Sequence, residues 1–159
     1  LISIRLKRRC IRLRALRQLA DRILHTAGHA QSLLSLVVVG DRHMRSLNRT
    51  FRRKNKTTDV LAFATREGPA PHSLLLGDVV IALPQALRQA RELGHEPDRE
   101  LTMLLIHGVL HLCGYDHEQG AAEARRMARR ERMILRAVTP FHDYWYLASG
   151  FEYDARWSR

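Results

Sequence analysis

Alternating hydrophobic and polar positions predict several short strands along the chain. Residues 2–7 alternate apolar with polar or basic side chains, as in a half-buried strand. The segment "SLLSLVVVG" at 32–40 is β-branched toward its end and stops at glycine, which predicts a buried strand. "TTDVLAFAT" at 57–65 and "LLLGDVVIAL" at 74–83 predict two more. The pattern therefore indicates one sheet of roughly four strands.

Apolar residues spaced three or four positions apart predict about five helices between and after these strands. The expected helices cover residues 11–27, Asp41 to at least Phe51, 84–93, 98–113 and about 119–138. Asp41 and Asp98 are expected to cap two helices, and Gly28 and Gly94 to end two others. Strands and helices in this order predict an α+β fold, with one mixed sheet packed against the helices.

The composition is that of a globular domain, or of one domain with a tail. Of 159 residues, 45% are hydrophobic and 27% are charged, which is enough for a sizeable core. No apolar run reaches the 18 or so residues of a membrane span, so no membrane partner is expected. Cys10 and Cys113 form no disulfide framework, which fits a reducing compartment and predicts a cytoplasmic protein.

The charge of the chain is strongly positive. Lys and Arg number 27 against 16 acidic residues, a formal net charge of +11, and only three of the basic residues are lysines. Arginine binds phosphate through a planar fork, so this excess favours a polyanionic partner. It is equally consistent with arginines that merely cover a solvated surface. Composition alone leaves the two interpretations balanced.

The segment "HGVLHLCGYDH" at 107–117 carries the most specific chemistry. His107 and His111 are four residues apart, so on a helix they lie on one face, about 5–6 Å apart at Cβ. If the helix continued, His117 would lie about 15 Å farther along its axis than His107. A left-handed turn at Gly114 would bring it back. The spacing therefore predicts three imidazole ligands for one metal ion.

Three protein ligands with one open position are typical of catalytic zinc, so we expect one Zn²⁺ per chain. Such an ion lowers the pKa of its bound water to about 7. Asp116 is either a fourth ligand or, as we favour, a partner for a histidine N–H. Cys113 lies about 200° around the helix from His111 and is expected in the core. A metzincin peptidase has its general base, glutamate, where this chain has Gly108, which disfavours a peptidase.

The same segment resembles the H-G-x-L-H-L-x-G-Y-D-H signature of the bacterial YbeY family of ribosomal RNA maturation endoribonucleases. "LNRTFRRKNKTTDVLAF" and "LLGDVVIA" are similar to the family's L-N-x-x-Y-R-x-x-D-x-x-T-D-V-L-S-F and L-G-D-I-V-I-S segments. The resemblance covers residues 1–138 as one zinc endoribonuclease domain and leaves 139–159 as a C-terminal extension of unknown role. The departures are Phe51 for Tyr, Asn55 for Asp, Ala62 for Ser, and no proline after Phe63.

The resemblance implies an α+β fold with the metal site at the end of a central helix, and it implies roles for two groups of residues. The implied zinc ligands are His107, His111 and His117. Arg52 is implied to face the phosphate as a catalytic residue, and it is expected to bind substrate together with Arg53 and Lys54. A basic run of this kind is otherwise usually a solvated face. Asp59, in the same region, is expected to hold its loop by side chain to backbone bonds.

The implied function is a single-strand-specific, zinc-dependent endoribonuclease of the cytoplasm. It would act in ribosomal RNA processing, namely 3′ end maturation of small-subunit ribosomal RNA, and in ribosome quality control. The implied partners are single-stranded RNA, ribosomal RNA, the small ribosomal subunit and its assembly factors. The alternative is a non-catalytic RNA-binding assembly factor whose zinc only stabilises the fold. A fourth ligand from the protein would favour that alternative, and an open position would favour catalysis.

One further pattern is a row of arginines on the last predicted helix. Arg125, Arg129, Arg132 and Arg136 recur at intervals of four, three and four residues, so they form one stripe. The simplest interpretation is a solvated helix face. The same face can also contact RNA.

Overall fold

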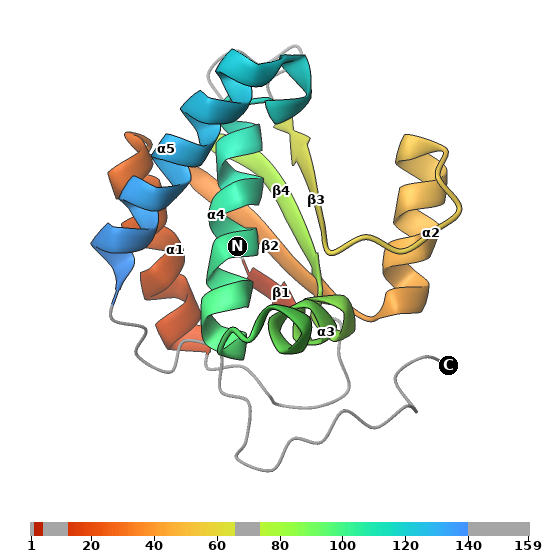
Figure 1. Cartoon of the computed structure of the whole chain (residues 1–159). Coiled ribbons are helices and arrows are strands. Elements are labelled where there is room, and N and C mark those ends of the chain that lie inside the picture. The colour runs from red at the N-terminus through yellow and green to blue at the C-terminus, as the bar shows by residue number, and fades with distance from the viewer. Residues whose placement is uncertain (1, 5–12, 66–73, 140–159) are drawn as a thin grey trace.

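A mixed four-stranded sheet forms the centre of the protein (Figure 1). The computed structural model of the chain describes residues 2–4, 13–65 and 74–139. The strand order is β1-β2-β4-β3, in which β1, β2 and β4 are parallel and β3 is antiparallel to β4. The strands are β1 (Ile2–Ile4), β2 (Leu33–Val39), β3 (Val60–Ala64) and β4 (Leu75–Ala82). The predicted α+β class and four-stranded mixed sheet are confirmed.

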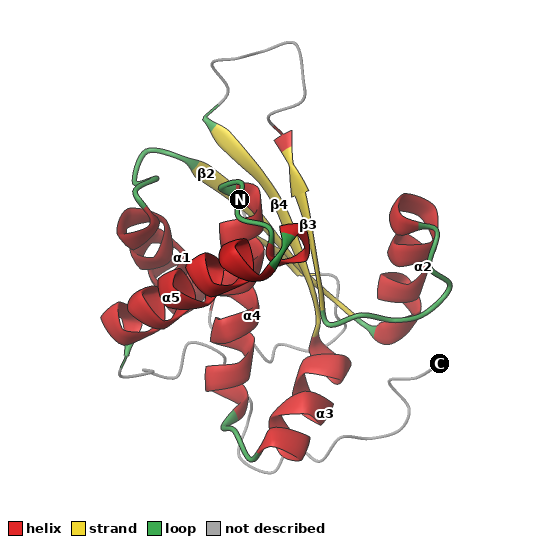
Figure 2. Ribbon diagram, turned by 45° about the horizontal axis from the view of Figure 1, so that its top comes forward, coloured by secondary structure: helices red, strands yellow, loops and turns green. Residues whose placement is uncertain are grey.

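Within the described residues, five α-helices accompany the sheet, as predicted, and α2 lies away from α1, α4 and α5 (Figure 2). They are α1 (Leu13–Ala27), α2 (Asp41–Arg52), α3 (Leu83–Leu93), α4 (Pro97–Leu112) and α5 (Ala121–Val138). A short 3₁₀ turn, η2 (His117–Gln119), joins α4 to α5. Of the described helices, none is both long enough and apolar enough to cross a membrane.

Strand β4 shows why both faces of the sheet are covered. Val79 and Ile81 belong to the large core that includes buried residues of α1, α4 and α5, whereas Val80 and Ala82 belong to a smaller core under α2. Successive strand residues point to opposite faces, so this alternation places α2 on one face and α4 on the other. A strand buried on both faces appears in the sequence as a continuous apolar run, as β4 does.

Helix α4 packs directly on the sheet and is buried over most of its length. At Gly108 the helix comes so close to the sheet that a Cβ atom would lie 2.7 Å from Cγ1 of Val79 and 3.4 Å from Cγ2 of Val60. Real Cβ atoms do not approach other atoms to 2.7 Å, so only glycine allows this spacing. The end of α4 that carries His107 and His111 is therefore held firmly against the sheet.

The N-caps of α2 and α4 lie one and two residues earlier, respectively, than the sequence predicts. Gly40, not Asp41, is the N-cap of α2, and the Asp41 carboxylate instead forms a 2.8 Å ion pair with Arg88 of α3. Helix α4 begins at Pro97, so Asp98 lies in its first turn rather than at its cap. Both aspartates still lie where the positive end of the helix dipole favours a carboxylate.

The predicted helix ends agree better with the structure. Gly28 and Gly94 follow α1 and α3 with φ values of 87° and 66°, a left-handed conformation that suits glycine. The predicted domain boundary after residue 138 stays a prediction, because residues 140–159 lie outside the described part of the chain. Cys10 lies outside it too.

Candidate metal centre

The last two turns of α4 present a pair of imidazoles to the same point. The Nε2 atoms of His107 and His111 lie 3.0 Å apart, and the ring centroids are 4.6 Å apart. Both side chains are half-buried. The helical spacing alone produces this pair, as the sequence predicts.

The chain then reverses and brings the third histidine to the pair. Gly114 has φ 91°, its N–H donates to the carbonyl of His111, and the Tyr115 N–H donates to the carbonyl of Leu110. These are the two hydrogen bonds of a Schellman helix end. The ring of His117 consequently lies 5.1 Å from the rings of both His107 and His111, centroid to centroid. The predicted reversal at Gly114 is confirmed.

The three imidazoles fit one divalent metal ion. One nitrogen from each of His107, His111 and His117 can be chosen so that all lie within 4.8 Å of one another. Two nitrogens bound tetrahedrally at about 2.0–2.1 Å from zinc would lie about 3.3 Å apart. The 3.0 Å separation between His107 and His111 therefore needs only a small adjustment. Imidazole donors suit zinc and several other transition metals, so the donor set fits a metal without identifying it.

Among the described residues, the group that could hold the ion contains these three histidines and no fourth acidic or thiol ligand. Cys113 packs against the main core, as predicted. Asp116 accepts a hydrogen bond from the Glu118 N–H at 2.9 Å and caps the η2 turn. That bond lowers the pKa of the Asp116 carboxyl group. We expected Asp116 to accept a hydrogen bond from a histidine N–H, but in the structure it accepts one from the Glu118 N–H.

Glu131 of α5 takes that role. Its Oε1 lies 2.8 Å from Nδ1 of His107. When the Nδ1–H donates a hydrogen bond to this carboxylate, the lone pair of Nε2 is left for a metal, and the ring is held in one orientation. Glu131 is not identifiable from the sequence pattern, because its contact with His107 depends on how α5 crosses α4. The available signal was that Glu131 is one of only two acidic residues in an arginine-rich helix.

The electrostatics of the site favour neutral imidazole at His111. Burial lowers the pKa of His111, and the neighbouring His107 and His117 lower it further, while Asp116 acts in the opposite direction. Arg52 also lowers the pKa of His111, so its guanidinium lies close enough to act on the site. The neutral form is the one that binds a metal.

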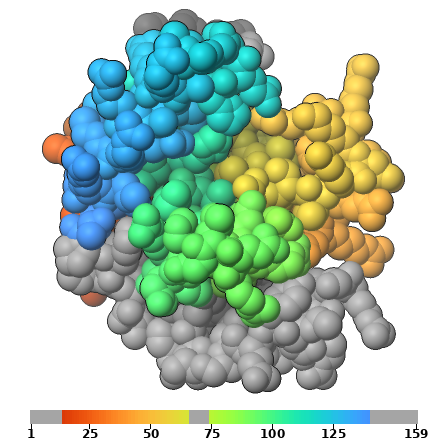
Figure 3. All heavy atoms as spheres, in the orientation of Figure 1, coloured from red at the N-terminus to blue at the C-terminus, as the bar shows by residue number. Residues whose placement is uncertain are grey.

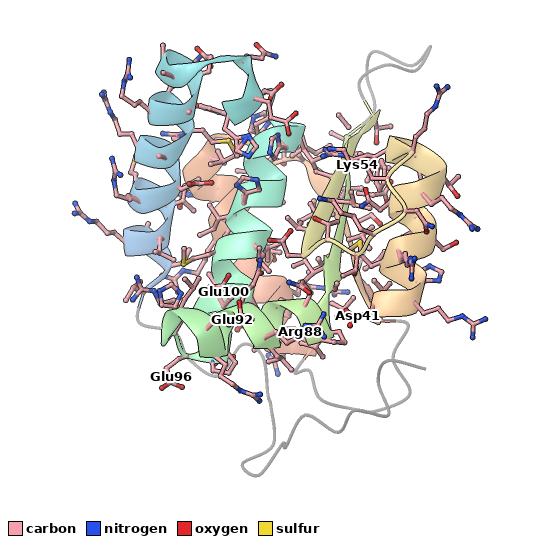
Figure 4. All side chains as sticks on the ribbon, turned by 45° about the vertical axis from the view of Figure 1, so that its right-hand side comes forward. Asp41, Lys54, Arg88, Glu92, Glu96 and Glu100 are labelled. Carbon is pink, nitrogen blue, oxygen red and sulfur yellow. The ribbon has the colours of Figure 1, made fainter. Side chains whose placement is uncertain are left out.

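The histidines lie in a cleft of about 650 Å³ between α4, α5 and the segment after α2. Arg52 and Lys54 line one wall, and Glu131 and Arg132 of α5 line the other. Figure 3 shows the surface hollowed between the blue and yellow segments, and Figure 4 shows Lys54 across from α4. Arg53 is the C-cap of α2, has φ 57° and is not among the residues that line the cleft. The structure thus brings Arg52 and Lys54 to the histidines but not Arg53.

Asp59 supports the wall opposite α5. Its Oδ1 accepts from the Val60 N–H at 2.8 Å, and its Oδ2 accepts from Nε2 of Gln89 at 3.0 Å. These bonds fix the start of β3 beside the cleft. The predicted structural role for Asp59 agrees with this geometry.

Comparisons with known proteins point to one family. The family model described as Endoribonuclease YbeY matches residues 2–139. The chain is 40% identical to the Endoribonuclease YbeY of Aquifex aeolicus, covering 84% of this chain and 89% of that protein. It is 46% identical to that of Geobacter metallireducens, covering 76% of this chain and 82% of the relative.

A solved structure has a similar fold. The solution structure of a Thermotoga maritima protein aligns with a TM-score of 0.59 and 22% identity, covering 87% of this chain and 89% of the other. At that identity the likeness supports the fold alone.

Proposed function

The chain belongs to the YbeY endoribonuclease family, and from this we propose that it cleaves single-stranded RNA using one zinc ion held by His107, His111 and His117. The observation that supports the proposal most directly is the convergence of three imidazole nitrogens inside a cleft with basic walls. Zinc with three protein ligands keeps one coordination position open, which is typical of catalytic rather than structural sites.

The residues around the histidines suit a phosphodiester substrate. When bound, a zinc ion supplies Lewis-acid chemistry. Arg52 lies at the cleft wall and acts electrostatically on His111, so its guanidinium is placed to offset negative charge on a phosphate in the transition state. Lys54 lines the same wall and contributes to holding the RNA backbone. Glu131 orients His107.

A peptidase is a weaker proposal for the same site. The residue after His107 is glycine, and a side chain at that position would begin in contact with Val79 and Val60. The glutamate that acts as general base in metzincins therefore has no counterpart here.

In the cell, we propose that the substrate is ribosomal RNA and that the protein acts in the cytoplasm. The proposed steps are 3′ end maturation of small-subunit ribosomal RNA and ribosome quality control, with the small subunit and its assembly factors as partners. Family membership and the net charge of +11 support these proposals.

RNA cleavage by the purified protein tests the central proposal. We expect cleavage of single-stranded RNA, slower cleavage of a duplex of the same sequence, loss of activity with chelator and recovery with zinc. His111→Ala should abolish cleavage, while His43→Ala, which alters an exposed histidine of α2, should not. Unchanged cleavage by His111→Ala would refute the site. Stoichiometric zinc and tight RNA binding without any cleavage would instead establish the non-catalytic assembly factor.

A further inference from the structure

Helix α5 carries a continuous row of exposed arginines, Arg125, Arg129, Arg132 and Arg136, here called the arginine stripe. At about 100° per residue, the four lie within a sector of about 60° and extend about 16 Å along the helix axis. All four are exposed. Figure 4 shows nitrogen-tipped side chains extending outward from this helix. The stripe is therefore a narrow band of positive charge on the outer surface.

The acidic residues of α5 do not neutralise the stripe. Glu131 pairs with His107, and Glu123 contacts Arg126 at 3.4 Å. In the part of the chain that the structure describes, no hydrogen bond or ion pair involves the four stripe arginines. The other two arginines of α5 differ, because Arg126 stacks on Tyr115 and Arg130 donates to the carbonyl of Thr26. Two arginines thus support the fold, and four are left for a partner.

The stripe is continuous with the metal-binding cleft. Arg132 belongs to both, since it lines the cleft beside Glu131. Arg129 and Arg125 continue from it toward the start of α5, and Arg136 lies one turn toward the other end. Successive stripe residues are separated by about 4.5–6 Å along the helix axis. A polyanion that leaves the cleft over α5 would meet one guanidinium after another.

We propose that the arginine stripe is a second RNA-binding surface, which holds the phosphate backbone of the substrate outside the cleft. The proposal rests on the proposed nuclease function. Arginine forms bidentate bonds with phosphate, and backbone contacts of this kind need no particular base sequence. A membrane surface fits less well, because membrane-binding helices expose a broad apolar face and the exposed face of α5 has a single large hydrophobic, Met133.

The test compares two variants with the same change in charge. The stripe variant combines Arg125→Gln, Arg129→Gln and Arg136→Gln, and it leaves the cleft residue Arg132 intact. The control variant combines Arg17→Gln, Arg42→Gln and Arg91→Gln, three exposed arginines on α1, α2 and α3. Binding of zinc-loaded proteins to unstructured RNAs of 5 and 20 nucleotides is measured at 50 and 200 mM salt, in the cold, with a gel to verify intact RNA.

We expect the stripe variant to bind the long RNA more weakly and with less salt dependence. Each single-strand phosphate contact contributes about 0.7 to the slope of log K against log salt, so three lost contacts reduce it by about 2. Over a fourfold change in salt, the parent should lose about 20-fold more affinity than the stripe variant. Binding of the short RNA should be unchanged, and the control variant should behave like the parent.

Two results would overturn the proposal. If the stripe and control variants bind the long RNA alike, the stripe is ordinary surface charge. If the stripe variant loses as much affinity for the short RNA as for the long one, the arginines act on the cleft and not as a second surface. Either result would leave the proposed nuclease function standing, because the parent protein would still bind and cleave the short RNA. If the parent protein binds neither RNA, the proposed function is refuted as well.

Discussion

Replacing Gly108 with alanine tests whether close packing of α4 on the sheet explains the glycine. The new Cβ would lie 2.7 Å and 3.0 Å from the two Cγ atoms of Val79. Val79 is fully buried in β4, between β2 and β3, and its β-branched side chain has little rotamer freedom. The methyl groups therefore cannot turn aside, and either the helix or the strand must move.

The expected cost of Gly108→Ala follows from two opposing effects. Overpacking a dense core costs about 1–3 kcal/mol. Replacing glycine with alanine within a helix raises the free energy of unfolding by about 1 kcal/mol through helix propensity. The free energy of unfolding should consequently fall by up to about 2 kcal/mol, or up to about 8 °C in Tm for a chain of this size.

A second substitution isolates the steric effect. Val79→Ala removes both Cγ atoms and alone should cost about 2 kcal/mol, from two buried methyl groups and the cavity they leave. In the double variant, the Cβ at position 108 enters that space. The combined cost should be smaller than the sum of the single costs by about 1 kcal/mol or more.

Urea unfolding of the four proteins, followed by circular dichroism in one fixed metal state, measures these values. Gly40→Ala is the control, because Gly40 has φ −87° and an added Cβ there meets nothing within 4 Å. Because Gly40 is the N-cap of α2, where alanine is less favourable than glycine, the stability of this variant should fall by no more than about 1 kcal/mol, and Val79→Ala should not offset that loss. If the costs of Gly108→Ala and Val79→Ala simply add, or if Gly108→Ala alone stabilises the protein by the full helix-propensity gain, the packing argument is wrong.

Three further predictions concern the site. Metal analysis of protein purified without chelator should return about one divalent ion per chain, and a value near zero in folded protein after zinc is added back would contradict the site. Glu131→Ala should weaken zinc binding about 10–100-fold, and Glu131→Gln, which keeps an acceptor for His107, should weaken it less. Equal zinc affinity of parent and Glu131→Ala would show that the carboxylate does not orient the ring. Arg52→Ala should leave zinc content and Tm nearly unchanged but lower kcat for RNA cleavage. Lys54→Ala should mainly reduce salt-dependent affinity, and Arg53→Ala, which changes a residue that does not line the cleft, should affect RNA binding least. Parent-like turnover by Arg52→Ala at saturating RNA would place Arg52 with the surface charge.

The convergence of His107, His111 and His117 could be predicted from the sequence because every step that brings them together is local. His107 and His111 are related by the helix repeat alone, and the Schellman bonds at Gly114 involve only neighbouring residues. Glu131 could not be found in this way. It reaches His107 across 24 positions, and that contact exists only because α5 crosses α4 in the folded chain.

The basic surface shows a similar division between local and tertiary information. The sequence predicts the arginine stripe from spacing alone and leaves open whether it is solvated or functional. The structure separates Arg126 and Arg130, which bind neighbouring groups, from the four stripe residues. It also separates Lys54, which lines the cleft, from Arg53, which turns the chain at the end of α2. Neighbouring basic residues therefore have different environments, and the sequence pattern does not predict these differences.

Gly108 affects both the packing of α4 on the sheet and the chemistry that the site can perform. The sequence indicates only that a peptidase-type general base is missing there. The structure adds that a side chain at this position would begin against Val79 and Val60, so a glutamate could be accommodated only if α4 moved away from the sheet. Such a shift would also displace His107, which immediately precedes Gly108, from its 2.8 Å contact with Glu131. The close packing that holds the three histidines together therefore also excludes the residue that a peptidase of this type requires.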